Sequence, residues 1–203
     1  MSLTASEARS RIVRADHRDV DDVAELIADA FQYLGIAVWL VPGRQDRRAV
    51  LRDHIRIYVE HALTYGEVHM SGDRSGVAVW FLRDGRPLPP PPDYDQRRAR
   101  ACGRWTERFQ VLDQLITVNR PTRPHHRLAF LAVLPGRQGE GVGSALLRHH
   151  HAQLDSIGIA AYVEATNPPS RDLYARHGYR AEEWFAVPDG TPFWPMWREP
   201  GSG

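Results

Sequence analysis

The sequence predicts a mixed α/β protein that forms a single domain over residues 1–203. Long runs with apolar residues at helical spacing alternate with short runs rich in β-branched residues, which are typical of strands. The length fits one hydrophobic core, since domains usually contain about 100–200 residues. The 42% hydrophobic and 25% charged residues are ordinary for a globular protein.

The N-terminal half is predicted to contain strands and helices in alternation. A short strand over 11–14 precedes two amphipathic helices, over 20–31 and 51–62. The segments 67–70 and 76–81 alternate in polarity on either side of a cluster of turn residues. That pattern predicts an antiparallel hairpin.

The C-terminal half begins with an interruption. The proline-rich segment 83–96 predicts an exposed loop, because proline removes backbone donors and fixes φ. Helical spacing returns over 97–118, and the continuous apolar run 128–133 is typical of a central strand covered on both faces. The remaining predicted elements are a helix over 144–156, a strand over 159–165, a helix over 170–177 and a hairpin of 179–187 with 191–198.

Composition excludes several functional classes. The formal net charge of +1 gives no overall field that would attract nucleic acid or an anionic membrane. No apolar run reaches the ~20 residues of a membrane span, and the first residues lack the apolar core of a signal peptide. Cys102 is the single cysteine, so it has no thiolate partner. We therefore expect a cytoplasmic protein without nucleic-acid or membrane partners, and homodimerisation stays open.

The segment VLPGRQGEGVGSALL at 133–147 has the pattern of a strand, a glycine-rich turn and a helix. Such a turn leaves backbone N–H groups free beside the positive end of the helix dipole, which favours a pyrophosphate. A tight connection without a ligand is the alternative. Ser144 stands where the dinucleotide fingerprint needs its third glycine, and the chain has no lysine for a nucleoside-triphosphate loop. Neither standard nucleotide motif fits.

Two segments resemble a known superfamily. VLPGRQGEGVG at 133–143 and NPPSRDLYARHGY at 167–179 resemble the paired motifs of GNAT-superfamily acyltransferases. The resemblance is greatest to the subgroup similar to puromycin N-acetyltransferase, and it includes GVAVW at 76–80 and PTRPHHRLAFLAV at 121–133. It implies a central mixed, mostly antiparallel sheet of about six to seven strands flanked by helices.

The resemblance implies an acetyl-CoA-dependent N-acetyltransferase that modifies a small amine. Main-chain groups of the glycine loop would hold the pyrophosphate, and the preceding strand would hold the pantetheine arm. Tyr174 matches the tyrosine that protonates the leaving thiolate. The residues implied in binding are Leu131, Ala132, Val133, Arg137, Gln138, Gly139, Glu140, Gly141, Val142, Gly143, Ser144, Asn167 and Ser170.

The base that deprotonates the amine has three candidates. Glu164 lies in an otherwise apolar strand, where a carboxylate needs a partner. It is either the base or a structural carboxylate bound to backbone or arginine. His126, before the central strand, is the rival because imidazole titrates near neutrality. A chain of water molecules could replace both.

The sequence predicts no metal site, since consecutive helical residues such as 149–151 point about 100° apart and cannot converge on one ion. These three histidines are expected on a solvated helix face. In the fold that the resemblance implies, the segments around the acceptor groove carry Phe31, Tyr33, Trp39, Trp194 and Trp197, which suggests a partly aromatic or apolar small amine. The alternative is that these rings only fill the core. A catalytically weak acyl-CoA-binding sensor or interaction domain is the alternative to an enzyme.

Overall fold

The computed structural model describes residues 11–83 and 88–201. Their strands form one eight-stranded sheet in the order β1-β2-β3-β4-β5-β8-β6, with β7 pairing to β8. Neighbouring strands run antiparallel except β4 and β5, which run parallel. The strands are β1 (Ile12–Arg14), β2 (Gly66–Ser71), β3 (Gly76–Arg83), β4 (His125–Val133), β5 (Ala160–Ala165), β6 (Arg180–Ala181), β7 (Phe185–Ala186) and β8 (Pro192–Arg198).

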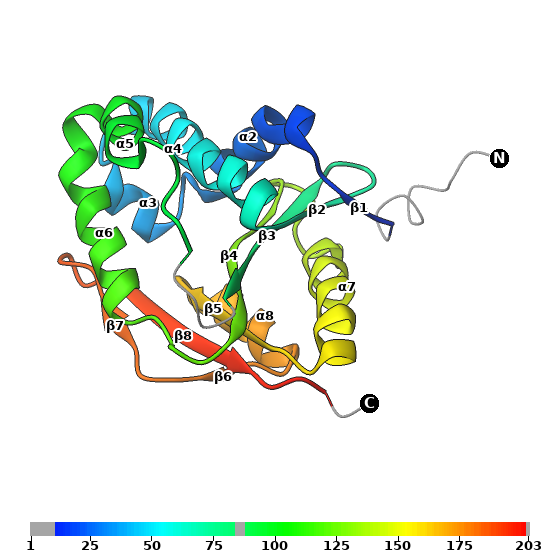
Figure 1. The fold of residues 1–203 in the computed structure, drawn as a ribbon. Coiled ribbons are helices and arrows are strands. Elements are labelled where there is room, and N and C mark those ends of the chain that lie inside the picture. Colours follow the sequence, from blue (N-terminus) through cyan, green and yellow to red (C-terminus); the bar gives the residue numbers. More distant parts are fainter. Residues whose placement is uncertain (1–10, 84–87, 202–203) are drawn as a thin grey trace.

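Helices cover both faces of the sheet (Figure 1). One face is covered by α2 (Val20–Phe31), α3 (Gly35–Leu40), α4 (Arg44–Tyr65), α5 (Tyr94–Cys102) and α6 (Thr106–Val118), and the other by α7 (Val142–Ile157) and α8 (Pro168–Arg176). Two short 3-10 turns, η1 (His17–Asp19) and η2 (Gly103–Trp105), lead into α2 and α6.

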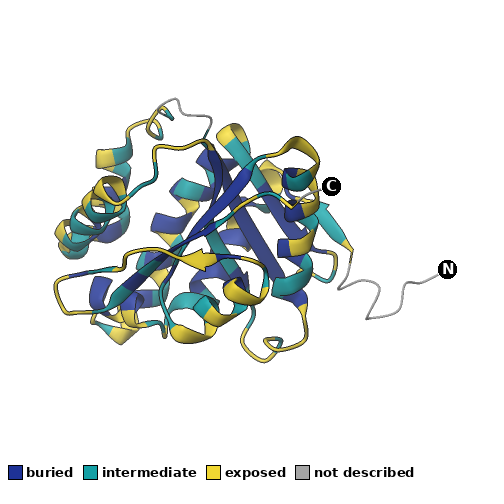
Figure 2. Ribbon diagram, turned by 90° about the horizontal axis from the view of Figure 1, so that it is seen from below, coloured by how far each residue is buried: buried dark blue, intermediate teal, exposed yellow. Residues whose placement is uncertain are grey.

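Strand β3 separates two hydrophobic cores. Val77, Val79 and Phe81 pack with α2, α3 and α4, whereas Ala78 and Trp80 pack with α7 and β5. The alternation follows from the two-residue period of a strand. Figure 2 shows the buried strands in dark blue between partly exposed helices. Both faces of the sheet are therefore buried along β3 from Gly76 to Phe81, and the strand becomes exposed at Leu82.

The parallel pair β4–β5 is joined over only part of its length. His125 to Leu128 pair with Ala160 to Val163, and the pairing stops there. Beyond this point β4 continues to Val133 with β3 as its strand partner, while β5 continues with β8. The sheet therefore opens between the carboxyl ends of two central strands, and peptide groups of β4 face the opening.

The predicted mixed α/β class and mostly antiparallel sheet are confirmed. The sheet has eight strands because the segment expected to form one hairpin arm, 179–187, is divided into β6 and β7. Helix α3 was not expected, since its six residues are too few to show a period. The predicted loop over 83–96 is shorter, because α5 begins at Tyr94 and Arg83 ends β3; residues 84–87 lie outside the described chain.

The expectation of a solvated histidine face on α7 is wrong. His150 and His151 are 1% and 5% exposed, and the His150 ring stacks on Trp80. Burial lowers the pKa of His150 to about 2 and that of His151 to about 3, so both rings are neutral. The neutral imidazole packs as a flat ring against the sheet, which polarity alone did not predict.

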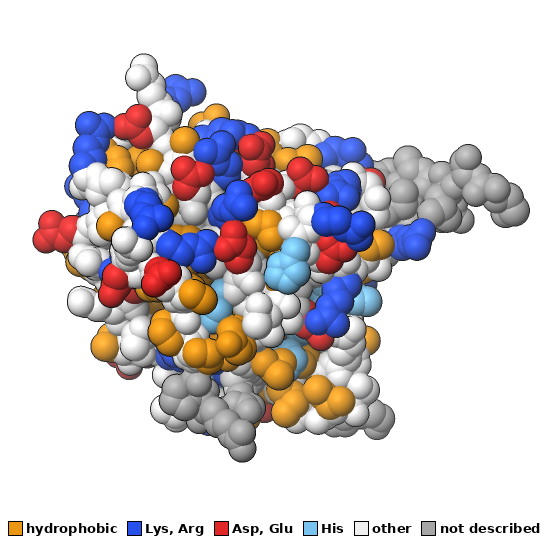
Figure 3. All heavy atoms as spheres, turned by 45° about the horizontal axis from the view of Figure 1, so that its top comes forward, with side chains coloured by type: hydrophobic (Ala, Val, Ile, Leu, Met, Phe, Trp, Pro, Cys, Tyr) orange, Lys and Arg blue, Asp and Glu red, His pale blue; other side chains and the backbone are white. Residues whose placement is uncertain are grey.

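Opposite charges alternate over the outer face of α2 and α4 (Figure 3). Arg48 lies between Glu25 and Asp29, and Arg56 pairs with Asp21. Exposed pairs of this kind each contribute about 1 kcal/mol or less. This surface is therefore a solvated exterior. Among the described residues, no helix has both the length and the apolar character that a bilayer crossing requires.

Gly66 should not tolerate alanine. A Cβ there would lie 1.9 Å from the backbone oxygen of Trp80, which cannot move without distorting β3. We expect Gly66→Ala to lower the free energy of unfolding by at least about 2 kcal/mol in chemical denaturation. Gly35→Ala is the control, because its Cβ would lie 3.4 Å from a Thr191 methyl group. Equal stability of the two variants would contradict this reading.

Candidate active site

A cavity of about 1060 Å³ lies where β4 and β5 separate. The carboxyl half of β4, the glycine loop, the first turn of α7, the end of β5 and α8 line one part of it. Residues of α2, α4, α5 and α6 line the other part. The opening in the sheet thus joins a polar, loop-bounded region to an apolar one.

The glycine loop directs backbone donors into this cavity. Gly136, Gly139 and Gly141 have φ values of 84°, 82° and 84°, a region that only glycine adopts readily. Gly141 caps α7 without a side chain, and the first helical bond joins the Ala145 N–H to the Gly141 oxygen. The N–H groups of residues 142–144 therefore have no acceptor within the helix.

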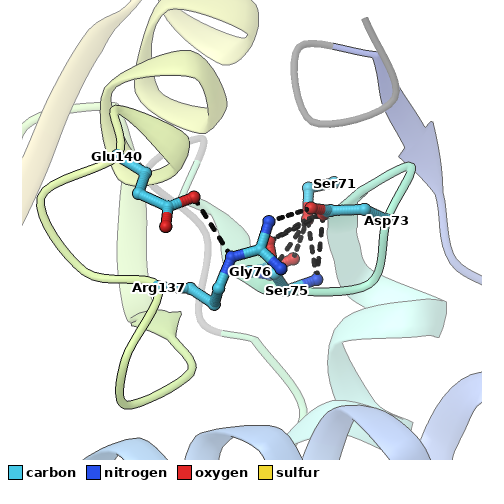
Figure 4. Close-up of polar contacts among 6 residues, drawn as sticks. All are labelled: Ser71, Asp73, Ser75, Gly76, Arg137 and Glu140. Carbon is cyan, nitrogen blue, oxygen red and sulfur yellow. Dashed lines mark hydrogen bonds and ion pairs between the residues drawn. The ribbon is translucent and has the colours of Figure 1, made fainter. Parts of the chain in front are cut away.

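Arg137 fastens the loop to the β2–β3 turn. Its guanidinium donates to Asp73 at 2.9 Å and to Glu140 at 3.1 Å (Figure 4). The Asp73 carboxylate also accepts hydrogen bonds from the hydroxyls of Ser71 and Ser75. These hydrogen bonds lower the pKa of Asp73 against its partial burial, so the carboxylate stays charged. Arg137 therefore holds the shape of the loop as well as lining the cavity.

Helix α8 presents Tyr174 to the opposite wall. Asn167 caps the helix by accepting the Ser170 N–H at 2.9 Å, with Pro168 in the first turn. Tyr174 lies in the same helix, is 6% exposed and lines the cavity. Burial, with a smaller effect from Glu164, raises the pKa of Tyr174 well above its usual value. The phenol therefore keeps its proton at neutral pH.

Glu164 and Arg127 form a buried ion pair across the β4–β5 fork, the point beyond Leu128 and Val163 where these two strands separate. Arg127 Nε lies 3.0 and 3.2 Å from the two carboxylate oxygens, and a terminal guanidinium nitrogen lies 3.0 Å from one of them. The side chains of Arg127 and Glu164 are 10% and 4% exposed. The partner that we expected for a carboxylate in this apolar strand is therefore Arg127, on the neighbouring strand β4.

His126 points away from this pair. Its Nδ1 lies 3.0 Å from Nε2 of His150, on the side of the sheet that α7 covers. Burial lowers the pKa of His126 to about 4. Within the described chain, the cavity lining contains Arg127 and Leu128 but does not contain His126.

The structure gathers nearly all the residues that the sequence singled out. Among the described residues, Glu140 is the one binding candidate outside the cavity lining, and it contacts Arg137 instead. The candidates in the lining are Leu131, Ala132, Val133, Arg137, Gln138, Gly139, Gly141, Val142, Gly143, Ser144, Asn167 and Ser170, with Tyr174 and Glu164.

Residues 106–181, from α6 to β6, match a family model described as an acetyltransferase (GNAT) domain. A structure described as the histone acetyltransferase HPA2 and related acetyltransferase from Corynebacterium glutamicum superposes with a TM-score of 0.64 at 23% identity, covering 95% of this chain and 97% of that one. The protein has the GNAT fold.

Further solved structures agree with the GNAT fold. An apo agmatine N-acetyltransferase superposes with a TM-score of 0.62 at 15% identity, covering 93% of this chain and 98% of that one. Arylalkylamine N-acetyltransferase 2 from Aedes aegypti gives 0.58 at 14% identity, covering 94% and 99%.

The apolar end of the cavity in this GNAT fold differs from the one expected. Of the aromatic residues proposed for the acceptor, Phe31 lines the cavity. Tyr33 is 64% exposed, whereas Trp39 is buried in the core. The aromatic lining comes instead from Tyr58, Phe81, Tyr94, Phe109, Phe130 and Phe193. Helical spacing could not show which rings of α4 and α6 turn towards one another.

A polar network at this end was also missed. Asp113 accepts hydrogen bonds from Tyr58 at 2.9 Å, from Tyr94 at 2.7 Å and from Arg98 at 2.8 Å. The network joins α4, α5 and α6 around one carboxylate, which is how a buried charge is tolerated. Tyr94 and Arg98 are neighbours on α5, but Tyr58 and Asp113 lie far from them in the sequence, and no local motif marks the set.

The ion pair at the fork yields a stability prediction. Arg127→Met leaves the Glu164 carboxylate buried without its cation, and we expect a loss of about 3–5 kcal/mol in the free energy of unfolding. The double variant Arg127→Met/Glu164→Leu should recover most of that loss, since no charge is then left uncompensated. Arg52→Met, at a 38% exposed side chain on α4, is the control and should cost less than about 1 kcal/mol. A double variant as unstable as the single one would refute the interpretation.

Proposed function

We propose that this protein is an acetyl-CoA-dependent N-acetyltransferase that acetylates a primary amine of a small molecule. The observation that carries the proposal is the cavity at the β4–β5 fork. It is bounded by free N–H groups of α7, an open edge of β4 and the protonated phenol of Tyr174. Each of these matches a requirement of acyl transfer from a thioester.

The donor fits the polar part of the cavity. The N–H groups of residues 142–144 and the positive end of α7 suit a pyrophosphate. Beyond Leu128, the edge of β4 that faces the opening offers peptide groups to the amides of a pantetheine arm. We assign this contact to Leu131, Ala132 and Val133. The N–H of Val133 would polarise the thioester carbonyl.

The reaction is a direct transfer within a ternary complex. The amine nitrogen attacks the thioester carbon, a C–N bond forms, and the C–S bond breaks. The amine gives up one proton, and Tyr174 supplies one to the leaving sulfur before solvent reprotonates the phenol. Holding both reactants in one cavity provides the proximity on which the rate depends.

Glu164 is our candidate for the proton acceptor, directly or through water. It lies at the fork and lines the cavity, unlike His126 among the described residues. Its carboxylate already accepts hydrogen bonds from Arg127, so the ion pair fixes its position. A chain of water molecules that ends on this carboxylate would carry the proton from the amine to the same acceptor.

The acceptor that we propose is a small amine with apolar or aromatic character. The aromatic lining around Tyr58 and Phe130 supports this class. The agmatine and arylalkylamine N-acetyltransferases share the fold, and their names describe small amines. The resemblance to the puromycin N-acetyltransferase subgroup points to the same class. An acyl-CoA sensor would not need Tyr174, so we prefer the enzyme.

Turnover of acetyl-CoA with a panel of small amines tests the function through release of free thiol. We expect at least one amine to accelerate release, and Tyr174→Phe to lower kcat about 100-fold without changing acetyl-CoA binding. The chain has no lysine, so acetylation of its own lysines cannot contribute.

Tyr33→Phe is the matched control, because that ring is 64% exposed. Normal turnover by Tyr174→Phe would contradict the proposal that Tyr174 protonates the leaving thiolate. Acetyl-CoA binding without turnover of any amine would favour the sensor, and absence of binding would overturn the assignment of the glycine loop.

A pair of glycine variants tests the loop itself. Gly141 and Gly190 have φ values of 84° and 88°, and a Cβ at either would meet no atom within 4 Å. Alanine therefore introduces a similar backbone strain of about 1–2 kcal/mol at each. Gly141→Ala should raise the Kd for acetyl-CoA about 10-fold, whereas Gly190→Ala in the β7–β8 turn should leave it unchanged. An equal Kd in both would contradict the loop assignment.

A further inference from the structure

Three side chains of types that can bind a metal ion converge outside the cavity described above. Glu67 and His69 lie on β2, and His150 lies on α7. One potential ligand atom from each residue falls within 4.8 Å of the other two. His69 and His150 are 3% and 1% exposed, while the side chain of Glu67 is 29% exposed and leaves an approach from solvent.

The polar atoms of this cluster face one another without hydrogen bonds. Oε2 of Glu67 lies 3.3 Å from Nε2 of His69 and 3.6 Å from Nδ1 of His150. Oε2 of Glu67 and Nδ1 of His150 are both buried, and neither atom has a hydrogen-bond partner within the described chain. A buried carboxylate oxygen in that state is costly unless a cation compensates it.

The spacing suits a tetrahedral ion. Two ligands bonded to one zinc ion at about 2.0–2.1 Å lie about 3.4 Å apart, close to the separations around Glu67. Burial favours the neutral imidazole, which is the form that binds a metal. A mixture of imidazole and carboxylate ligands suits Zn²⁺ and disfavours Mg²⁺, which prefers oxygen alone.

The surroundings also fix the orientation of His150. Its other ring nitrogen, Nε2, lies 3.0 Å from Nδ1 of His126. Its ring stacks on Trp80 with centroids 4.0 Å apart. Metal-binding histidines characteristically use their second nitrogen for such a hydrogen bond, which sets the tautomer. If His150 donates to His126, its Nδ1 lone pair points at the Glu67 carboxylate.

We propose that Glu67, His69 and His150 bind a structural Zn²⁺ ion, with a water molecule as fourth ligand. The ion would connect β2 to α7, the helix whose first turn carries the free N–H groups of the glycine loop. It would lie on the α7 side of the sheet, and none of its three protein ligands lines the cavity that we assign to acetyl transfer. Consecutive histidines of α7 cannot bind one ion together, but β2 brings Glu67 and His69 to one of them.

Metal content and spectroscopy of the untagged chain test this site. After incubation with Zn²⁺ and desalting, we expect elemental mass spectrometry to find one bound zinc ion per chain. After incubation with Mg²⁺ and desalting, we expect no bound magnesium. Substitution with Co²⁺ should give the visible absorption bands of a four-coordinate ion. Zn²⁺ at about 100 times its Kd should raise Tm by roughly 5–10 °C.

Glu67→Gln and His150→Asn should each abolish the zinc, the Co²⁺ bands and the rise in Tm. His17→Asn, at an exposed residue of η1, is the control and should keep all three. Because His150 is buried, its variant could fail to fold; Glu67→Gln, at the partly exposed ligand, then decides. A wild-type chain that retains no zinc, or zinc retained equally in both ligand variants, would overturn the proposal.

Discussion

The separation of β4 from β5 determines most of the functional architecture. Two parallel strands that stay paired bury their peptide groups in a continuous ladder. Here the ladder stops at Leu128 and Val163, and β4 runs on with one edge open. Such an edge needs either water or a ligand as its hydrogen-bonding partner. The glycine loop follows the open end of β4, and α8 follows the end of β5, so both chain turns lie at the mouth of the same opening.

The Arg127–Glu164 pair stands at the point of separation. Arg127 is among the last β4 residues paired to β5, while Glu164 is the first β5 residue beyond that pairing. A buried ion pair adds little net stability compared with an apolar replacement, but it penalises any arrangement that separates its members. The main effect of the pair is therefore to fix the position at which the two strands separate, and its net contribution to the free energy of unfolding is small compared with an apolar replacement. The pair also fixes the position of a carboxylate in the lining of the cavity.

The sequence predicted those parts of the site that depend on local spacing. The glycine loop and the position of Tyr174 on a short helix each follow from a short motif. Contacts between distant segments were not predictable in this way: Asp73 is 64 residues from Arg137, and Tyr58 is 55 residues from Asp113. No period or motif relates such pairs. The histidines of α7 show the same limit, since His150 packs on Trp80 of β3, and α5, α6 and β4 lie between these two residues in the chain.

The end of the cavity to which we assign the pyrophosphate is built mainly from peptide groups, and Arg137 beside it is already paired with Asp73 and Glu140. Alanine scanning of the loop residues other than glycine deletes side chains and leaves the amides in place, so it would make this end look unimportant. Only a change to the main chain, such as replacing an amide by an ester in the first turn of α7, removes a donor directly. An engineer who wished to change which acyl-CoA the proposed site accepts at this end would accordingly need to alter the path of the backbone.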